Sequence, residues 1–180
     1  MTIREIRWPE EFEAIKRIDA SFSSASTFHV VREGHSFILS EKKASPPLQK
    51  SYSLSGLGEQ ILPSDHTFVA ENSAGLLGIA SMRFEAWNKR AILRHLYIAA
   101  EHRGLGTGRA LVEAVAACAR ALGARCLWAE TQNTNHPAVQ FYLRLGFQLC
   151  GLDTSLYKMS NDPAAEIGLF FTKPVTTQFA

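Results

Sequence analysis

Three glycines at alternate positions, Gly104, Gly106 and Gly108, form the segment most able to do chemistry. They follow a β-rich run and open an amphipathic helical pattern, so the backbone N–H groups of the first helical turn would be unpaired there. The positive end of the helix dipole reinforces these amides and favours an anion. Arg103 and Arg109 flank the glycines and could add charge-assisted hydrogen bonds. The pattern predicts a phosphate or pyrophosphate site; a glycine-rich connection with solvated arginines is the structural alternative.

The residues around the glycines argue against two common phosphate-binding motifs. A Walker loop requires Lys and then Ser or Thr after its last glycine, whereas Arg109 and Ala110 stand there. A dinucleotide fingerprint requires glycine at the position of Arg109 and belongs to the first turn of a parallel βαβ unit. The strands before Gly104 read as antiparallel, so a nicotinamide cofactor is disfavoured, although Glu130 stands about 20 residues on, where a ribose-binding acid would lie.

Two blocks of sequence resemble one enzyme family. The segment 103–108 (RGLGTG), after the strand Leu96–Ile98, resembles the acetyl-CoA site of the GCN5-related N-acetyltransferases, the GNAT family. The segment 135–147 (NHPAVQFYLRLGF) resembles that family's later helix and the Gly-Phe step after it. The resemblance covers residues 67–159. Several shorter segments are similar to streptothricin N-acetyltransferases in particular: residues 37–41, 46–52, 130–135, 151–157 and 166–171.

The resemblance implies which residues would hold acetyl-CoA. The pantetheine arm would pair with the backbone of Leu96, Tyr97 and Ile98, and a backbone N–H there would polarise the thioester carbonyl. Asn135 would bond to the cofactor arm, although the same residue also fits a plain helix N-cap. The pyrophosphate would be held by the arginines and by the backbone amides of the glycine-rich turn: Arg103, Gly104, Leu105, Gly106, Thr107, Gly108 and Arg109.

The resemblance also implies catalytic roles. Tyr142 occupies the family's general-acid position, near the sulfur of the leaving thiolate. The alternative for Tyr142 is core packing beside Phe141. The base is less defined: Glu130, or Glu85 further out, could deprotonate the amine through water, and a dedicated base is unnecessary if the free amine binds directly.

The chain departs from the streptothricin-type enzymes at Arg94 and His95, where those enzymes carry an acidic pair. An arginine would repel a polycationic amine and attract a carboxylate, so Arg94 is a candidate for substrate binding. The period of two along a strand puts Arg94 on the face of Leu96 and His95 on the opposite face. We therefore expect His95 to be packed rather than catalytic.

The elements expected around these residues give a mixed α/β fold. Its sheet is mostly antiparallel, with splayed parallel strands flanked by helices, as in the GNAT fold. We expect one domain over residues 1–180: a variable substrate-side region (1–66), an acetyl-CoA-binding core (67–159), and a last strand and tail (160–180). The front region reads as a helix (8–21), a Ser-rich loop (22–26), a short strand (35–40) and a long surface excursion (44–66). In the core we expect strands at 67–71, 76–84, 91–99, 125–129 and 147–150 with helices at 105–122 and 137–145, followed by a last strand at 167–171 and a frayed tail after residue 172.

Composition restricts the partners. The 180 residues carry 19 basic and 17 acidic side chains, a balance too even for electrostatic capture of nucleic acid or membrane. No apolar run approaches the roughly 20 residues of a membrane span, and the N-terminus lacks the apolar stretch of a signal peptide, so we expect a cytoplasmic protein. Three distant cysteines predict neither a disulfide framework nor a metal site. A monomer or homodimer is expected.

These features predict an N-acetyltransferase that moves an acetyl group from acetyl-CoA to a primary amine of a small molecule. Modification of a streptothricin-like antibiotic is the leading specific reading. Two alternatives stay open at this point: acetylation of a protein N-terminus or lysine, and a non-catalytic acyl-CoA-binding sensor.

Overall fold

The computed structural model describes residues 1–61, 65–157 and 166–175. Contacts divide the chain into two compact units. The first comprises Met1–Ser21, Ser51–Ala129 and the described part of Lys173–Ala180; the second comprises Phe22–Lys50 and Glu130–Thr172. These limits differ from the regions expected from sequence, and the organisation as one domain stays a prediction.

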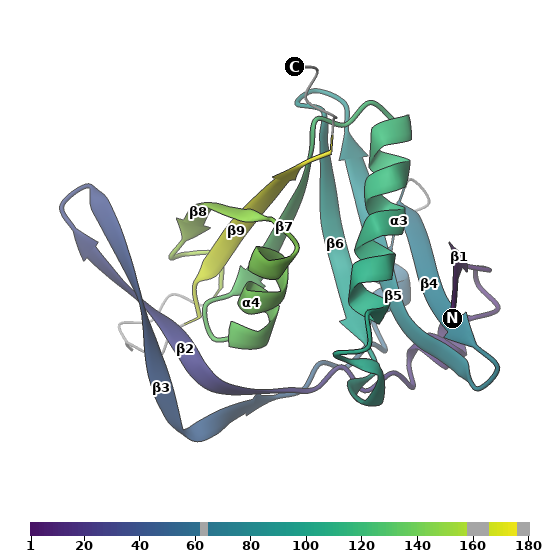
Figure 1. The fold of residues 1–180 in the computed structure, drawn as a ribbon, viewed down its shortest axis with the longest axis horizontal. Coiled ribbons are helices and arrows are strands. Elements are labelled where there is room, and N and C mark those ends of the chain that lie inside the picture. The colour runs from purple at the N-terminus through teal and green to yellow at the C-terminus, as the bar shows by residue number, and fades with distance from the viewer. Residues whose placement is uncertain (62–64, 158–165, 176–180) are drawn as a thin grey trace. The chain divides into compact units, whose positions relative to one another are not determined.

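The first unit is built on a mostly antiparallel sheet. Its strands are β1 (Thr2–Glu5), β4 (His66–Asn72), β5 (Gly75–Glu85), β6 (Arg90–Ile98) and the N-terminal part of β7 (Cys126–Gln132), hydrogen-bonded in that order. Among these described strands, β1–β4, β4–β5 and β5–β6 pair antiparallel and β6–β7 pairs parallel, with Ala91 opposite Leu127. The helix α3 (Thr107–Ala121) runs along β4, β5 and β6 (Figure 1). The sequence-based strands at 67–71, 76–84 and 91–99 and the helix at 105–122 are confirmed, and so is the mixed fold class.

Three short helical elements of this unit lie in or beside a cluster of buried apolar side chains. They are α1 (Phe12–Ile15), α2 (Leu57–Gln60) and the 3-10 turn η1 (Ala100–His102). The buried cluster there consists of Ile15, Ile18, Ala20, Leu54, Leu57, Val69, Ile79 and Ala99. The expected helix over 8–21 is therefore wrong in extent, because only its middle is α-helical, and the first strand was not predicted.

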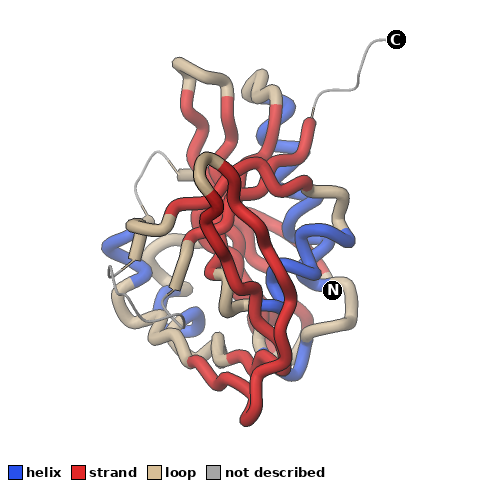
Figure 2. Tube along the Cα trace, turned by 90° about the vertical axis from the view of Figure 1, so that its left-hand side faces the viewer, coloured by secondary structure: helices blue, strands red, loops and turns tan. Residues whose placement is uncertain are grey.

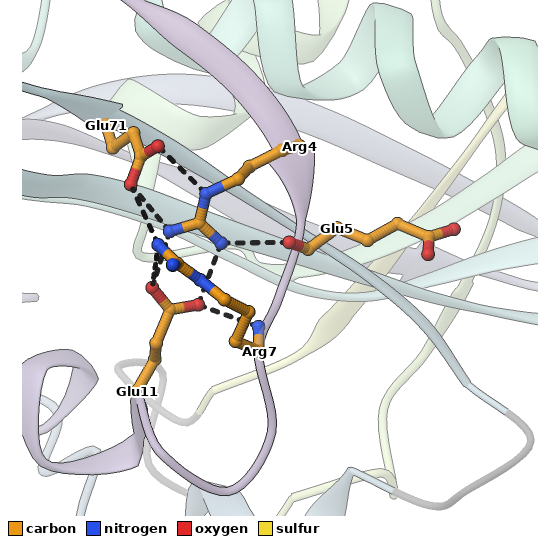
Figure 3. Close-up of polar contacts among 5 residues, drawn as sticks. All are labelled: Arg4, Glu5, Arg7, Glu11 and Glu71. Atoms are coloured by element: carbon orange, nitrogen blue, oxygen red, sulfur yellow. Dashed lines mark hydrogen bonds and ion pairs between the residues drawn. The ribbon is translucent and has the colours of Figure 1, made fainter.

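An ion-pair network fixes the edge strand β1 (Figure 3). The guanidinium of Arg4 donates to Glu71 Oε1 at 2.8 Å and to Glu11 Oε2 at 2.9 Å, and so ties β1 both to β4 and to the start of α1. The hydrogen bond from Arg4 lowers the pKa of Glu11 to about 2 and lowers the pKa of Glu71. Both carboxylates are held ionised at neutral pH.

The second unit begins with a long hairpin where loops were expected. The strands β2 (Phe22–Glu33) and β3 (Ser36–Lys50) lie side by side at the front of Figure 2. The expected loop at 22–26 is thus wrong, and so is the first part of the excursion expected at 44–66, because residues 44–50 belong to β3. Residues 62–64 of that excursion lie outside the described residues. Pro46 and Pro47 favour a loop in the sequence. In the structure they lie where the register is interrupted, between the pairs Ser24–Leu48 and Ser26–Lys43, a position that needs no backbone N–H.

The rest of the second unit follows the expected order. The C-terminal part of β7 leads to α4 (His136–Arg144) and β8 (Gln148–Asp153), and β9 (Gly168–Pro174) lies between β7 and β8. The predicted frayed tail is corrected at its start. Val175 and Arg125 both belong to the first unit; Val175 is buried, and its N–H donates to Arg125 O at 3.2 Å. Residues 176–180 lie outside the described residues. None of the helices within the described ranges has the length and apolar character needed to cross a membrane.

Candidate active site

The C-terminal half of β6 has backbone N–H groups that point away from its neighbour β5. The N–H of Ala99 donates to Leu77 O at 2.9 Å, and the pair Leu96–Ala80 lies in the same antiparallel register. Because hydrogen bonding alternates along such a ladder, the N–H groups of Leu96 and Ile98 point away from β5. The pairing of β6 with β7 in this unit spans Arg90–Leu93 and Cys126–Ala129. The edge at 96–98 can therefore receive an extended ligand as an added strand.

Gly78 on β5 lets the two strands approach each other at this point. A Cβ on Gly78 would lie 2.7 Å from the Tyr97 carbonyl oxygen and 2.8 Å from the Ile98 side chain. Residue 78 is the direct partner of Ile98 in a pair of the closely spaced kind. Any side chain there would displace the strand that carries the outward amides. Gly78 was not predicted from sequence as a residue of the site.

The glycine-rich turn has the conformation that an anion site requires. Gly104 (φ +75°) and Gly106 (φ +89°) are left-handed, and Gly106 is the N-cap of α3 without a side-chain capping bond. The first-turn amides of a 15-residue helix are thus not capped by a side chain. Added to the helix dipole, this arrangement fits a pyrophosphate. The predicted residues 103–109 do lie together in this turn.

The two arginines of the turn differ in their contacts. Arg103 donates from Nε to Ile98 O at 2.9 Å, from Nη2 to Asp19 O at 3.0 Å, and from Nη1 to Ser21 O. It therefore links the end of β6 to the segment after α1, a positioning role that sequence did not indicate. Arg109 is exposed and makes no hydrogen bond or ion pair with any residue the structure describes, so its guanidinium is available to an anion.

Arg94 lies at an irregularity of β6. The register shifts between the pairs Ser81–His95 and Met82–Leu93, which leaves Arg94 as the extra residue of a β-bulge. The bulge interrupts the period of two on which the expected shared face with Leu96 depended. The side chain is exposed. Its role in substrate binding stays a prediction.

His95 is buried, as expected. It is 8% exposed and its ring stacks on that of Tyr97 with centroids 6.2 Å apart. It lies opposite Ser81, which lies opposite Thr67. Each of these three residues has a buried polar atom without a hydrogen-bond partner among the described residues: Thr67 Oγ1, Ser81 Oγ and His95 Nε2.

This burial makes stability depend on pH. Desolvation, reinforced by the positive charges of Arg94 and Arg83 and opposed by Asp65, lowers the pKa of His95 to about 4 from its ordinary 6.5. The unfolded chain takes up the proton first as pH falls, so this contribution is complete above pH 6.5 and is lost as pH falls toward 4. The full shift corresponds to at most about 3 kcal/mol.

We expect His95→Gln to remove this pH dependence. Urea unfolding of both proteins at about pH 7.5 and about pH 5 measures it. Glu130, whose pKa burial raises, contributes in the opposite direction, so the test is the difference between the two proteins rather than the wild-type slope. Equal loss of unfolding free energy in both proteins would contradict the assignment.

Tyr142 belongs to the second unit, on α4. It is 6% exposed, and its ring packs against those of Phe141, Phe147 and Phe171 with centroid distances of 5.6, 5.3 and 5.7 Å. The packing alternative is therefore confirmed. It fixes the phenol in place and is compatible with a role as acid, which stays a prediction.

Two asparagines organise the turn between β7 and α4. Asn135 caps α4, its Oδ1 accepting from Ala138 N at 3.2 Å, so the N-cap reading is confirmed. The Nδ2 group of Asn135 has no hydrogen bond within the described residues and is available to a ligand. Asn133, missed by sequence, donates from Nδ2 to Phe28 O at 2.8 Å and accepts from Ile167 N at 2.8 Å. It joins β2 to the start of β9.

Glu130, on β7, is hydrogen-bonded to a tyrosine that lies 27 residues further along the chain. Tyr157 donates its hydroxyl to Glu130 Oε1 at 2.6 Å. Burial raises the pKa of Glu130, and the bond from Tyr157 opposes that rise. A carboxylate with a raised pKa suits a general base. No cluster of His, Cys, Asp and Glu able to hold a metal ion occurs in the described ranges.

Comparisons with known proteins agree with this geometry. The model of the acetyltransferase (GNAT) family matches residues 8–147. A streptothricin acetyltransferase of Streptomyces lavendulae is 40% identical over 157 residues, 83% of each chain, and one of Escherichia coli is 26% identical over 166 residues, 91% of each chain.

Solved structures extend the likeness to the fold. The crystal structure of a nourseothricin acetyltransferase is 37% identical with a TM-score of 0.86, over 97% of this chain and 98% of that one. A Bacillus anthracis structure in complex with acetyl coenzyme A is 22% identical with a TM-score of 0.81, over 96% of this chain and 98% of the other, which shows a shared fold. Because the family model spans most of the chain and the 40% identical relative covers more than two thirds of it, this chain is a member of the GNAT family, whose enzymes transfer acetyl groups from acetyl-CoA.

Proposed function

We propose that this enzyme acetylates a primary amine of a streptothricin-class antibiotic. The observation that carries the proposal is the 40% identity with the Streptomyces lavendulae streptothricin acetyltransferase over 83% of both chains. The nourseothricin acetyltransferase, at 37% identity over nearly the full length, supports the same acceptor class.

The first unit supplies residues for the cofactor. Acetyl-CoA, when bound, brings an activated thioester carbonyl. The outward amides of Leu96 and Ile98 would donate to the extended pantetheine arm, and one of them would stabilise the negative charge that develops on the carbonyl oxygen. The amides of residues 104–109, with Arg109, would bind the pyrophosphate. Arg103 would act indirectly, because it fixes the end of β6, just before the turn, to the segment after α1.

The second unit supplies the proposed proton carriers. Glu130 would accept a proton from the acceptor ammonium, leaving a neutral amine able to attack. Tyr142 would give a proton to the sulfur as the carbon–sulfur bond breaks. The Asn135 amide group would bond to the cofactor arm. These three roles rest on the family resemblance and on the side-chain contacts within the second unit.

Arg94 bears on the choice of acceptor. Its exposed guanidinium would attract a carboxylate and repel a cation. We propose that it contacts the acceptor, so the enzyme would differ from its relatives in tolerance of positive charge near the reacting amine. A cytoplasmic monomer or homodimer remains our expectation.

A panel of acceptors tests the proposal. Thiol release from acetyl-CoA is followed with streptothricin, aminoglycosides, polyamines, free amino acids and lysine peptides. Turnover on streptothricin well above all other acceptors is expected. A preference for a carboxylate-bearing amine or for the lysine peptides would overturn the proposed acceptor, and tight acetyl-CoA binding without turnover on any acceptor would favour a sensor.

A further inference from the structure

Tyr157 bridges two side chains of one strand. Glu130 and Gln132 lie two residues apart on β7, so both side chains project from the same face. The hydroxyl of Tyr157 lies 2.6 Å from Glu130 Oε1 and 2.8 Å from Gln132 Nε2. Tyr157 follows β8, so the fold brings it back to β7 across 27 residues of sequence.

The direction of these bonds follows from the groups. The amide nitrogen of Gln132 can only donate, so the Tyr157 oxygen accepts from it. The phenolic proton is therefore directed to Glu130 Oε1. Gln132 thus orients the hydroxyl, and the hydroxyl fixes the carboxylate.

The second carboxylate oxygen of Glu130, Oε2, differs from Oε1 in its contacts. Oε2 makes no hydrogen bond and no ion pair with any residue in the described ranges. Lys50, whose positive charge acts on this carboxyl, forms an ion pair with Glu166 at 2.5 Å. One oxygen is anchored and the other is available to receive a proton.

We propose that Tyr157 is a positioning residue that holds Glu130 as the base of the acetyl transfer. The inference rests on the proposed function. Glu130 Oε2 takes one proton from the ammonium, and the resulting amine forms the nitrogen–carbon bond as the carbon–sulfur bond breaks. The second nitrogen proton is lost as the amide forms, the thiolate receives one proton, and one proton per turnover passes to solvent.

The pH profile of Tyr157→Phe provides the test. Removing the donor raises the pKa of Glu130, because the lost bond favoured the ionised form. The acid limb of kcat/KM for the acceptor should move up by about one pH unit, and kcat near neutral pH should fall several-fold with KM for acetyl-CoA unchanged. Ser155→Ala is the matched control: it removes a hydrogen bond of the same segment, to Asp153, without touching Glu130, and should leave the limb in place.

A double variant and a titration separate the possible failures. In a Glu130→Gln background, Tyr157→Phe should change kcat no further. A 13C-carboxyl NMR titration, with Glu130→Gln to assign the signal, should show Glu130 titrating at higher pH in Tyr157→Phe, whatever the acceptor. An unmoved carboxyl titration, or an additive loss in the double variant, would overturn the inference. If the titration moves but streptothricin is not acetylated, the proposed acceptor fails and the contact stands.

Discussion

Tyr142→Phe is expected to lower kcat by about 100-fold and to leave the affinity for acetyl-CoA unchanged. The hydroxyl is the only group removed, and the ring keeps its contacts with the three phenylalanines that surround it. A general acid assists the reaction only as the thiolate leaves, so its loss appears in kcat rather than in cofactor binding. A thiol-release assay measures kcat, and calorimetry with acetyl-CoA measures the affinity for the cofactor.

Phe147→Leu serves as the control for packing. Phe147 is 2% exposed and lies 5.3 Å from the Tyr142 ring centroid, so the change loosens the same cluster but keeps the hydroxyl. We expect a loss of roughly 1 kcal/mol in unfolding free energy with kcat within a few-fold of wild type. If Tyr142→Phe kept wild-type kcat, the hydroxyl would have no part in the chemistry and Tyr142 would be a packing residue alone.

Gly106→Ala is expected to weaken acetyl-CoA binding by about 10- to 100-fold. A Cβ at this position meets no atom within 4 Å, so the effect does not come from a clash. It comes from the backbone: φ of +89° is costly for an alanine, and relaxation would turn the amides at the start of α3 away from the ligand. Isothermal titration calorimetry with acetyl-CoA measures the change in affinity directly.

Gly123 at the other end of α3 provides a matched control. It has φ of +78° and an equally open surrounding, so Gly123→Ala carries a similar backbone cost. Both variants should lose about 1 kcal/mol of stability, but only Gly106→Ala should lose affinity for acetyl-CoA. Equal affinities for acetyl-CoA in the two variants would contradict the assignment of the anion site to this turn.

The parts of the site that sequence predicted are those encoded locally. The glycine-rich turn, the strand before it and the helix after it depend on neighbouring residues, and the structure has all three. His95 could be placed in the interior because it stands in a β-rich run, and alternate residues of the strand up to His95 are buried. Asn135 could be recognised as a cap because it precedes Pro137 at the start of a helix.

The parts that sequence did not predict depend on distant contacts. Nothing near Tyr157 in sequence shows that its hydroxyl meets Glu130, and Arg103 could not be seen to bind the carbonyls of Asp19 and Ser21. The hairpin of β2 and β3 was not predicted because its two prolines favour a loop, whereas in the structure they lie where the ladder is interrupted. The bulge at Arg94 likewise depends on the pairing with β5 rather than on local sequence.

The most direct test of the account is the product of the wild-type enzyme with acetyl-CoA and streptothricin. Mass spectrometry of the antibiotic is combined with a thiol assay on the same sample. We predict one acetyl group on a primary amine of streptothricin for each equivalent of thiol released. Thiol release with unmodified streptothricin, or no thiol release with acetyl-CoA bound, would contradict the proposed function.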